Sequence, residues 1–198
     1  MIYPKSVDDL DLVSAWRAGD RGAGDTLIRR HLEAILRFFR TKLGDDVEDL
    51  VQRTFLDLLE VDAQVVSVRA TLFTIAKRRL VDHLRQSYAR AGAVELDPSL
   101  SVADLGTSPS GAVARNQQEQ LLGAALRSIP LEYQIALELA YWEELSGAEI
   151  AQILGIAEPT VRSRLTRARE ALREVFACMG PVELSITTLA AVDARIGF

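Results

Sequence analysis

The stretch EIAQILGIAEPTVRSRLTRAREALR, residues 149–173, determines how the C-terminal part of this chain folds. Ser146, just before it, is suited to cap a helix whose apolar residues recur at helical spacing. Gly155 can adopt the left-handed backbone that ends a helix. Pro159 suits the first turn of a second helix, where its missing N–H is not needed. The stretch therefore predicts two helices joined by a tight turn.

The second of these helices has a narrow apolar side and a broad polar one. Spacings of four, three and four residues separate the apolar positions, which are Val161, Leu165, Ala168 and Leu172. This arrangement is typical of a helix-turn-helix, in which the second helix is free to enter a DNA major groove. The candidate DNA-contacting side chains outside the apolar side are Thr160, Arg162, Ser163, Arg164, Thr166 and Arg167. The alternative is a solvated helix whose arginines pair with Glu170 and Glu174.

Positive charge is concentrated in two segments of an acidic chain. The formal net charge is -5, yet residues 158–178 hold five Lys or Arg against three Asp or Glu. Residues 61–92 hold six Lys or Arg against two Asp or Glu. The net charge alone argues against nucleic acid as a partner, but this distribution favours it.

The remaining sequence predicts an all-α fold of two small helical domains, the second a helix-turn-helix domain. Apolar residues recur mostly three and four positions apart, and 48% of the 198 residues are hydrophobic. The expected N-terminal helices cover about 8–18, 25–43, 45–60 and 70–90, and a loop covers 61–69. The glycines of AGDRGAGD are expected to separate the first two. The expected apolar residues of the second are Ile28, Leu32, Ile35, Leu36 and Phe39; those of the fourth are Leu72, Ile75, Ala76, Leu80 and Leu84.

Residues 91–112 divide the two predicted domains. Helical periodicity fails there, and Gly, Pro, Ser and Ala are frequent, which predicts a flexible linker, with an ordered surface loop as the alternative. The first domain is then 1–90 and the second 113–178. Residues 179–198 form a C-terminal extension of unknown role.

The composition excludes several classes of protein. Cys178 is the only cysteine, so one chain can form neither a disulfide framework nor a multi-thiolate metal site. No phosphate-binding or dinucleotide-binding glycine motif and no catalytic cluster is present, so we expect no enzyme activity, no cofactor and no metal. The N-terminus is too polar for a signal peptide, and no apolar run is long enough for a membrane span, so we expect a cytoplasmic protein.

Two blocks in order resemble the extracytoplasmic-function sigma factors of bacterial RNA polymerase. DDVEDLVQRTFLDLL followed by ATLFTIAKRRLVDHLR resembles their first domain, and LRSIPLEYQIALELAYWEELSGAEIAQILGIAEPTVRSRLTRAREALR resembles their second. The resemblance covers about residues 8–177. It implies a protein that binds core RNA polymerase, at the clamp coiled coil of the largest subunit and at the flap, and directs it to promoter DNA of one regulon. An anti-sigma factor is a further expected partner.

The resemblance also assigns the polymerase contacts. In the family, the helix matching 46–60 docks on the clamp coiled coil, and the matching positions are Asp49, Leu50, Gln52, Phe55 and Leu56. Apolar anchors beside polar groups suit such an interface. An ordinary core role for Phe55 is an equal alternative.

The same family comparison divides the promoter between the two domains. The helix matching 70–88 contacts the minus-ten element, which implies that Lys77, Arg78, Arg79 and Arg85 hold strand phosphates and that His83 stacks on a base or hydrogen-bonds to it. A functionless surface histidine is the alternative for His83. The helix matching 159–173 reads the minus-thirty-five element. The sequence departs from the family at Thr71, where tryptophan is common, and at Arg78, where asparagine is common, and the base-capturing loop 61–69 has no aromatic residue.

Other interpretations stay open. A DNA-binding regulator without polymerase activation is one, and an interaction protein that does not use DNA is another. The acidic residues Asp97 and Asp104 suggest a linker that mimics nucleic acid, with a linker that is only solvated as the alternative. The extension is either a partly ordered terminus or a segment that folds back on a domain through its apolar residues, which are Leu184, Ile186, Leu189 and Val192.

Overall fold

The computed structural model describes residues 7–61, 65–90, 101–103 and 117–179, and within these ranges it has eight helices and no β-strand. The all-α prediction is therefore confirmed. The helices are α1 (Asp9–Arg17), α2 (Arg21–Leu43), α3 (Glu48–Glu60), α4 (Val68–Arg90), α5 (Gln117–Arg127), α6 (Leu131–Tyr141), α7 (Gly147–Leu154) and α8 (Glu158–Cys178).

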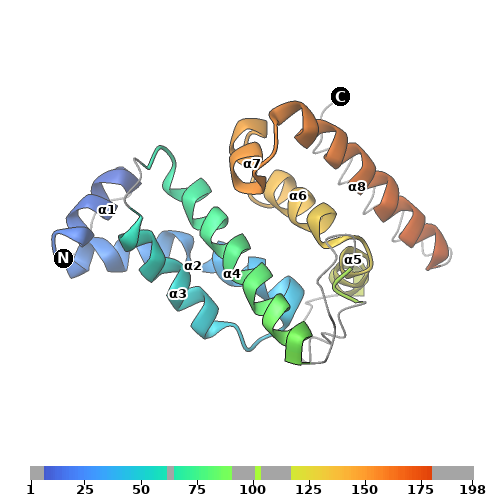
Figure 1. Cartoon of the computed structure of the whole chain (residues 1–198), viewed down its shortest axis with the longest axis horizontal. Helices are drawn as coiled ribbons and strands as arrows, with labels where there is room; N and C mark the ends of the chain where they lie inside the picture. The colour runs from blue at the N-terminus through green and yellow to red at the C-terminus, as the bar shows by residue number, and fades with distance from the viewer. Residues whose placement is uncertain (1–6, 62–64, 91–100, 104–116, 180–198) are drawn as a thin grey trace.

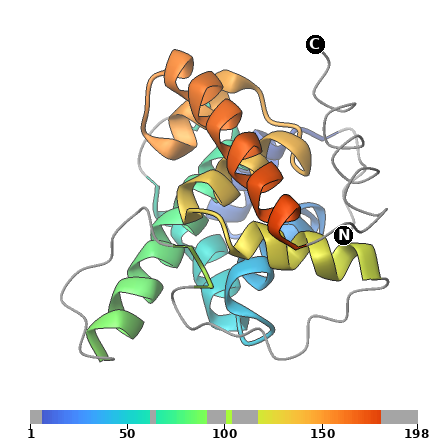
Figure 2. The ribbon, with the colours of Figure 1, turned by 90° about the vertical axis from the view of Figure 1, so that its right-hand side faces the viewer.

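The helices form two bodies that lie against each other. Helices α1–α4 make the N-terminal body, and α5–α8 make the C-terminal body beside it (Figure 1). The bodies meet where α4 packs on α7 and where α2 contacts α5. Helix α8 packs on α6 and α7 on the outer side, away from α1–α4 (Figure 2). The helix-turn-helix thus lies against the helix predicted to contact the minus-ten element.

Helix α6 joins the two bodies because it is apolar on more than one side. Leu131, Ile135 and Leu139 belong to the same buried cluster as the core of the N-terminal body. Leu137 faces a second cluster, which α5, α6 and α8 share and which includes Phe176. The two predicted domains therefore share one continuous core in this structure.

The predicted glycine break between the first two helices is wrong in its position. Helix α2 begins at Arg21, because the Asp20 carboxylate accepts hydrogen bonds from the backbone N–H groups of Gly22 and Ala23. Gly24 lies inside the helix, where a Cβ would come within 2.6 Å of the Trp16 indole. Gly24 therefore permits α1 to pack closely on α2 and does not interrupt the helix.

The apolar residues of α2 divide between two sides of the helix. Ile35 and Phe39 are buried in the core. Leu32 is exposed, and Ile28 and Leu36 are only partly buried. The five apolar positions that the sequence identifies are therefore not all in the core, and Leu32 with Ile28 and Leu36 leaves an apolar strip of α2 at the surface.

Helix α4 is buried along the stripe that the sequence predicts, since all five of its predicted residues are in the core. The helix starts at Val68, two residues earlier than expected. The Ser67 hydroxyl accepts a hydrogen bond from the Ala70 backbone N–H and so satisfies a donor of the first turn.

Most of the predicted linker lies outside the described residues, as do Asp97, Asp104 and the C-terminal extension after residue 179. Of residues 91–112, only 101–103 are described. Val102 is fully buried in the core, and the backbone N–H of Ala103 donates to the Arg127 carbonyl at 2.9 Å. At these three residues the chain is held against the C-terminal body.

Candidate nucleic-acid and polymerase interfaces

The turn between α7 and α8 has the local features that the sequence predicts. The Ser146 hydroxyl accepts from the Glu149 backbone N–H, and the Glu149 carboxylate accepts from the Ser146 backbone N–H. This capping box lowers the pKa of Glu149, because the hydrogen bonds from Ser146 favour its charged form. Gly155 ends α7 with a φ of 70°, and Pro159 lies in the first turn of α8. The two helices therefore form a helix-turn-helix.

The side of α8 away from the core carries the side chains expected to contact DNA. Arg162 and Arg167 are exposed and extend from the helix, and Thr160 is exposed at its start. The Ser163 hydroxyl donates to the Thr160 carbonyl, and the Thr166 hydroxyl donates to the Arg162 carbonyl. A basic helix face with short hydroxyl side chains suits a phosphate backbone.

Arg164 differs from its neighbours on α8. Its side chain is only 19% exposed, and its Nη2 lies 3.0 Å from a carboxylate oxygen of Glu132 on α6. The sequence-based assignment of Arg164 to DNA rests on its charge, whereas the structure has it bridging two helices of the C-terminal body.

The basic residues of α4 have three different environments. Arg78 and Arg79 both donate to the carboxylate of Asp57 on α3, and the Arg79 hydrogen bond is the main cause that lowers the pKa of Asp57. Arg85 is exposed, with Asp82 at 3.9 Å, and His83 is partly buried. Arg78 and Arg85 are similarly exposed, at 64% and 67%, but Arg78 is paired with Asp57, as is the less exposed Arg79.

Lys77 is covered by the helix-turn-helix. Its Nζ donates to the backbone carbonyls of Ile153 and Leu154, at 3.1 and 2.9 Å. These carbonyls lie at the C-terminal end of α7, where the helix dipole favours a cation. Burial lowers the pKa of Lys77, and the nearby Arg164 lowers it further. This residue, assigned to the minus-ten element, is therefore engaged within the protein.

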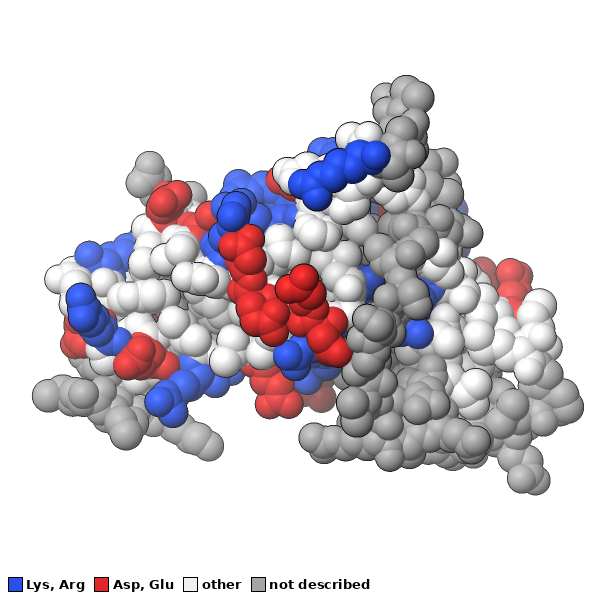
Figure 3. Space-filling view, turned by 90° about the horizontal axis from the view of Figure 1, so that it is seen from below, with Lys and Arg blue, Asp and Glu red and all other residues white. Residues whose placement is uncertain are grey.

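The residues assigned to polymerase lie along α3. Asp49 and Gln52 are exposed, and Asp49 pairs with Arg53 one turn later. The exposed acids at the start of α3 are Asp45, Asp46, Glu48 and Asp49. Viewed from below, acidic side chains gather near the middle of the molecule (Figure 3). A basic partner would meet complementary charge there.

Apolar side chains continue this surface toward α2. Leu56 is 49% exposed, whereas Phe55 is buried and Leu50 is partly buried. Leu56 lines an open groove of about 490 Å³ between α1, α2 and α3, to which Leu32 and Leu36 also contribute. Phe55 therefore belongs mainly to the core, and the accessible anchor positions are Leu56 and the apolar strip of α2.

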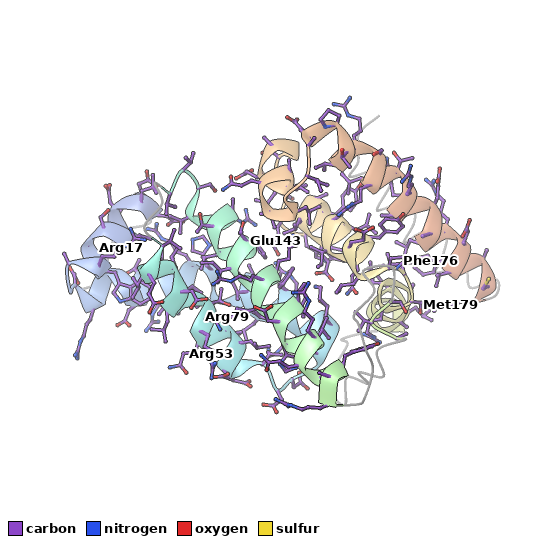
Figure 4. All side chains as sticks on the ribbon, viewed as in Figure 1. Arg17, Arg53, Arg79, Glu143, Phe176 and Met179 are labelled. Carbon is purple, nitrogen blue, oxygen red and sulfur yellow. The ribbon has the colours of Figure 1, made fainter. Side chains whose placement is uncertain are left out.

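Charged residues that the sequence analysis did not single out join the two bodies. Glu143, which follows α6, lies between α4 and α6 (Figure 4). Its carboxylate oxygens accept from Arg37 of α2 at 2.6 Å and from Arg69 of α4 at 2.7 Å. Lys42 of α2 is fully buried and donates to Glu138 of α6. We call these five residues the ionic seam.

Burial and pairing act in opposite directions on the ionic seam. Desolvation lowers the pKa of Lys42, and the carboxylate of Glu138 opposes that shift. Lys42 also donates to the Phe38 carbonyl at 2.7 Å. Gln134 donates to Glu138, but its own Oε1 is buried with no hydrogen-bond partner. Because buried charges must be desolvated, such a seam holds the bodies specifically without adding much net stability.

No helix among the described residues is long and apolar enough to cross a membrane. In the same part of the chain, no group of three or more His, Cys, Asp or Glu side chains is arranged to hold a metal ion.

Comparison with known proteins agrees with this geometry. Residues 27–90 match the family "Sigma-70 region 2", and residues 119–172 match "Sigma-70, region 4". The chain is 33% identical over 176 residues to the ECF RNA polymerase sigma factor SigM of Mycobacterium tuberculosis, covering 85% of this chain and 84% of SigM.

Two solved structures have a similar fold. CnrH, in complex with the cytosolic domain of CnrY, superposes with a TM-score of 0.62 at 22% identity, over 87% of this chain and 99% of CnrH. RpoE of Bartonella quintana, in complex with the anti-sigma factor NepR, superposes with a TM-score of 0.58 at 23% identity, over 76% of this chain and 94% of RpoE. With a region 2, a helix-turn-helix region 4 and this similarity to SigM, the chain belongs to the extracytoplasmic-function sigma factors, which direct RNA polymerase to promoters.

Proposed function

We propose that this sigma factor rests in a closed form, docks on core RNA polymerase through the groove beside α3, and then opens to read its promoter. The observation that carries the proposal is the pair of hydrogen bonds from Lys77 to α7. Helix α4 cannot present Lys77 to the minus-ten element while α7 covers it. Promoter recognition by both regions therefore requires that α4 and α7 separate.

The polymerase-binding surface is accessible in the closed form. The groove is lined by residues of α1, α2 and α3, and none of its lining residues comes from the C-terminal body. Leu56, Leu32 and Leu36 offer apolar anchors, while Asp49 and Gln52 supply a polar rim. A helix of the polymerase clamp fits this chemistry, because amphipathic helices bind apolar grooves with polar edges. Polymerase can thus bind region 2 before region 4 moves.

In the open form, each region contributes one basic helix to the promoter. We assign Arg85 and the uncovered Lys77 of α4 to phosphates of the minus-ten element. We assign the exposed Arg162 and Arg167 of α8 to the minus-thirty-five element. The predicted division into domains 1–90 and 113–178, joined by 91–112, allows these two helices to reach separate elements. The protein acts in this scheme as a binding factor in the cytoplasm, and polymerase performs the catalysis.

An anti-sigma factor is the second partner that we propose. RpoE of Bartonella quintana, which has a similar fold, forms a complex with the anti-sigma factor NepR, and this supports the proposal. An anti-sigma factor that contacts both bodies at once would stabilise the closed form, because the two bodies form a joint binding surface only while they are packed together.

Run-off transcription with purified core polymerase and fragmented genomic DNA tests the proposal. We expect discrete start sites that share two upstream elements. Leu56→Asp is expected to weaken polymerase binding at least tenfold, since it puts a charge into an apolar contact. Val66→Asp is the matched control, because Val66 is also exposed but lies outside the groove. Equal polymerase affinity of Leu56→Asp and wild type would refute the docking surface, and absence of start sites would refute the function.

A further inference from the structure

The two arginines that bind the Glu143 carboxylate in the ionic seam are arranged like an anion-binding site. Arg37 and Arg69 come from different helices of the N-terminal body, yet they converge on one carboxylate. Each guanidinium donates to a different oxygen of that carboxylate. The Glu143 side chain is only 4% exposed, while Arg37 and Arg69 stay 39% and 40% exposed. Both arginines therefore keep donors at the surface that the carboxylate does not use.

A phosphodiester presents the same pattern of acceptors, with two charged oxygens on one atom. Arginine recognises carboxylate and phosphate groups through the same forked donors. We propose that Arg37 and Arg69 form a phosphate-binding site for the promoter DNA strand, which Glu143 fills whenever region 4 is folded against region 2. This inference rests on the proposed opening of the two bodies.

The surroundings of the site also favour an anion. Arg69 lies in the first turn of α4, where the helix dipole favours negative charge. A second carboxylate of region 4 is directed to the same place, because the Ser67 hydroxyl donates to Glu149 at 3.2 Å. Region 4 therefore sets two acids against the start of α4. Opening the seam would remove both and leave the start of α4 accessible.

The backbone after α6 shows that Glu143 is held in place by its turn. Glu144 has a φ of 50°, a left-handed conformation that side chains other than glycine disfavour. The Glu143 backbone N–H donates to the Glu138 carbonyl at 3.1 Å, and that of Leu145 donates to the Leu139 carbonyl at 3.1 Å. The turn that carries Glu143 is therefore fixed to α6 by two backbone hydrogen bonds.

Opening would add a third cation to the site. Lys42 is fully buried beside Glu138, and the charge of Glu143 also acts on it. Once α6 withdraws, Lys42 regains water on the same side of region 2 as Arg37 and Arg69. The three residues would then give region 2 a basic surface that extends from α4 to α2.

Binding of a short, mixed-sequence single-stranded DNA to the full chain tests the site, because phosphate contacts do not depend on sequence. Fluorescence anisotropy at several salt concentrations gives the affinity and its salt dependence. We expect Glu143→Gln to bind about tenfold more tightly, as one charge-assisted contact becomes free for DNA. The slope of log affinity against log salt should steepen by about 0.7 for one added phosphate. Glu143→Ala, which brings no amide group near the arginines, is a second version of the same test.

Replacing the two arginines distinguishes a phosphate-binding role from a role that only holds the two bodies together. In the Glu143→Gln background, Arg37→Gln with Arg69→Gln should abolish the gain in affinity and the added slope. Arg29→Gln in that background is the matched control, because Arg29 is an exposed arginine of the same helix. If the arginines only hold the bodies together, removing them will raise DNA binding as Glu143→Gln does.

The outcomes are separable from those of the proposed function. Unchanged DNA binding by both Glu143 variants, or a gain that survives loss of Arg37 and Arg69, overturns the phosphate site. Neither result depends on polymerase. A failure of wild-type run-off transcription would instead overturn the proposed function and leave the binding result standing.

Discussion

Replacing Lys42 by methionine removes one half of a buried ion pair that joins the two bodies. The Lys42 side chain is 0% exposed and that of Glu138 is 8% exposed. Loss of one partner leaves the other charge buried without compensation, which typically costs about 3–5 kcal/mol. In the open form Glu138 would be hydrated, so this cost falls on the closed form alone. The ratio of open to closed molecules should therefore rise roughly 100- to 4,000-fold.

Energy transfer between two dyes measures that ratio. Cys178 is exposed and is the only cysteine of the chain, so it accepts one dye on α8. A cysteine in place of exposed Arg29 accepts the second on α2. We expect Lys42→Met to convert the population to low transfer efficiency.

A double variant and a surface control make this test specific. Lys42→Met with Glu138→Leu should restore the closed form, because replacing a buried pair by apolar residues is often neutral or stabilising. Arg53→Met breaks an exposed pair with Asp49, worth only about 0.3–0.5 kcal/mol, and should not open the bodies. If Lys42→Met stays closed, or if the double variant is as open as the single one, the reasoning about the seam is wrong.

Three further predictions concern single elements. Ser146→Ala should lower the free energy of unfolding by about 1 kcal/mol, whereas Ser146→Asp keeps a capping acceptor; equal urea midpoints of all three proteins would contradict the role of the capping box. The pKa of Asp57 is lowered, so its hydrogen bond from Arg79 stabilises the fold above pH 3.8, the ordinary pKa of this group, and this contribution is lost as the pH falls through the lowered pKa. Asp57→Asn should therefore lack this acid-dependent loss of stability in unfolding measured against pH. Arg162→Gln and Arg167→Gln should each reduce the salt slope of duplex DNA binding by about 0.9, and Arg164→Gln, which is paired with α6, should not; equal slopes would contradict the assigned DNA face.

The local features of the fold could be predicted from the sequence because short-range chemistry determines them. Ser146, Gly155 and Pro159 each act on their own turn of the chain, so the helix-turn-helix follows from their order. Gly24 shows the limit of this reasoning. From the sequence alone, Gly24 is interpreted as a helix break. In the structure the indole of Trp16, eight positions earlier, occupies the space that a side chain at Gly24 would need.

The candidate site could be predicted in part for the same reason. Helical spacing was enough to identify the exposed arginines of α8. Neither helical spacing nor family resemblance shows which cations already have partners. Lys77 and Arg79 were assigned to DNA by the resemblance, and Arg164 by its place outside the apolar side of its helix, whereas the structure pairs each of them within the protein.

The ionic seam itself left no pattern in the sequence. Lys42 and Glu138 are 96 residues apart, and no periodicity connects them. Lys42 occupies a core position of α2, and Glu138 lies in an apolar helix. In the sequence, each is a charged residue without an evident partner, and only the structure shows that they pair.

The separation of Arg37 and Glu143 along the chain also determines the order in which the two residues are synthesised. The two residues are 106 positions apart, and Arg37 leaves the ribosome first. At a synthesis rate of about 5–20 residues per second, the second partner is made roughly 5–20 s later. For that interval the nascent N-terminal body carries its arginines without the acid that neutralises them. In a newly made molecule these arginines can therefore bind polyanions before the bodies close, whereas in the complete closed protein Glu143 neutralises them.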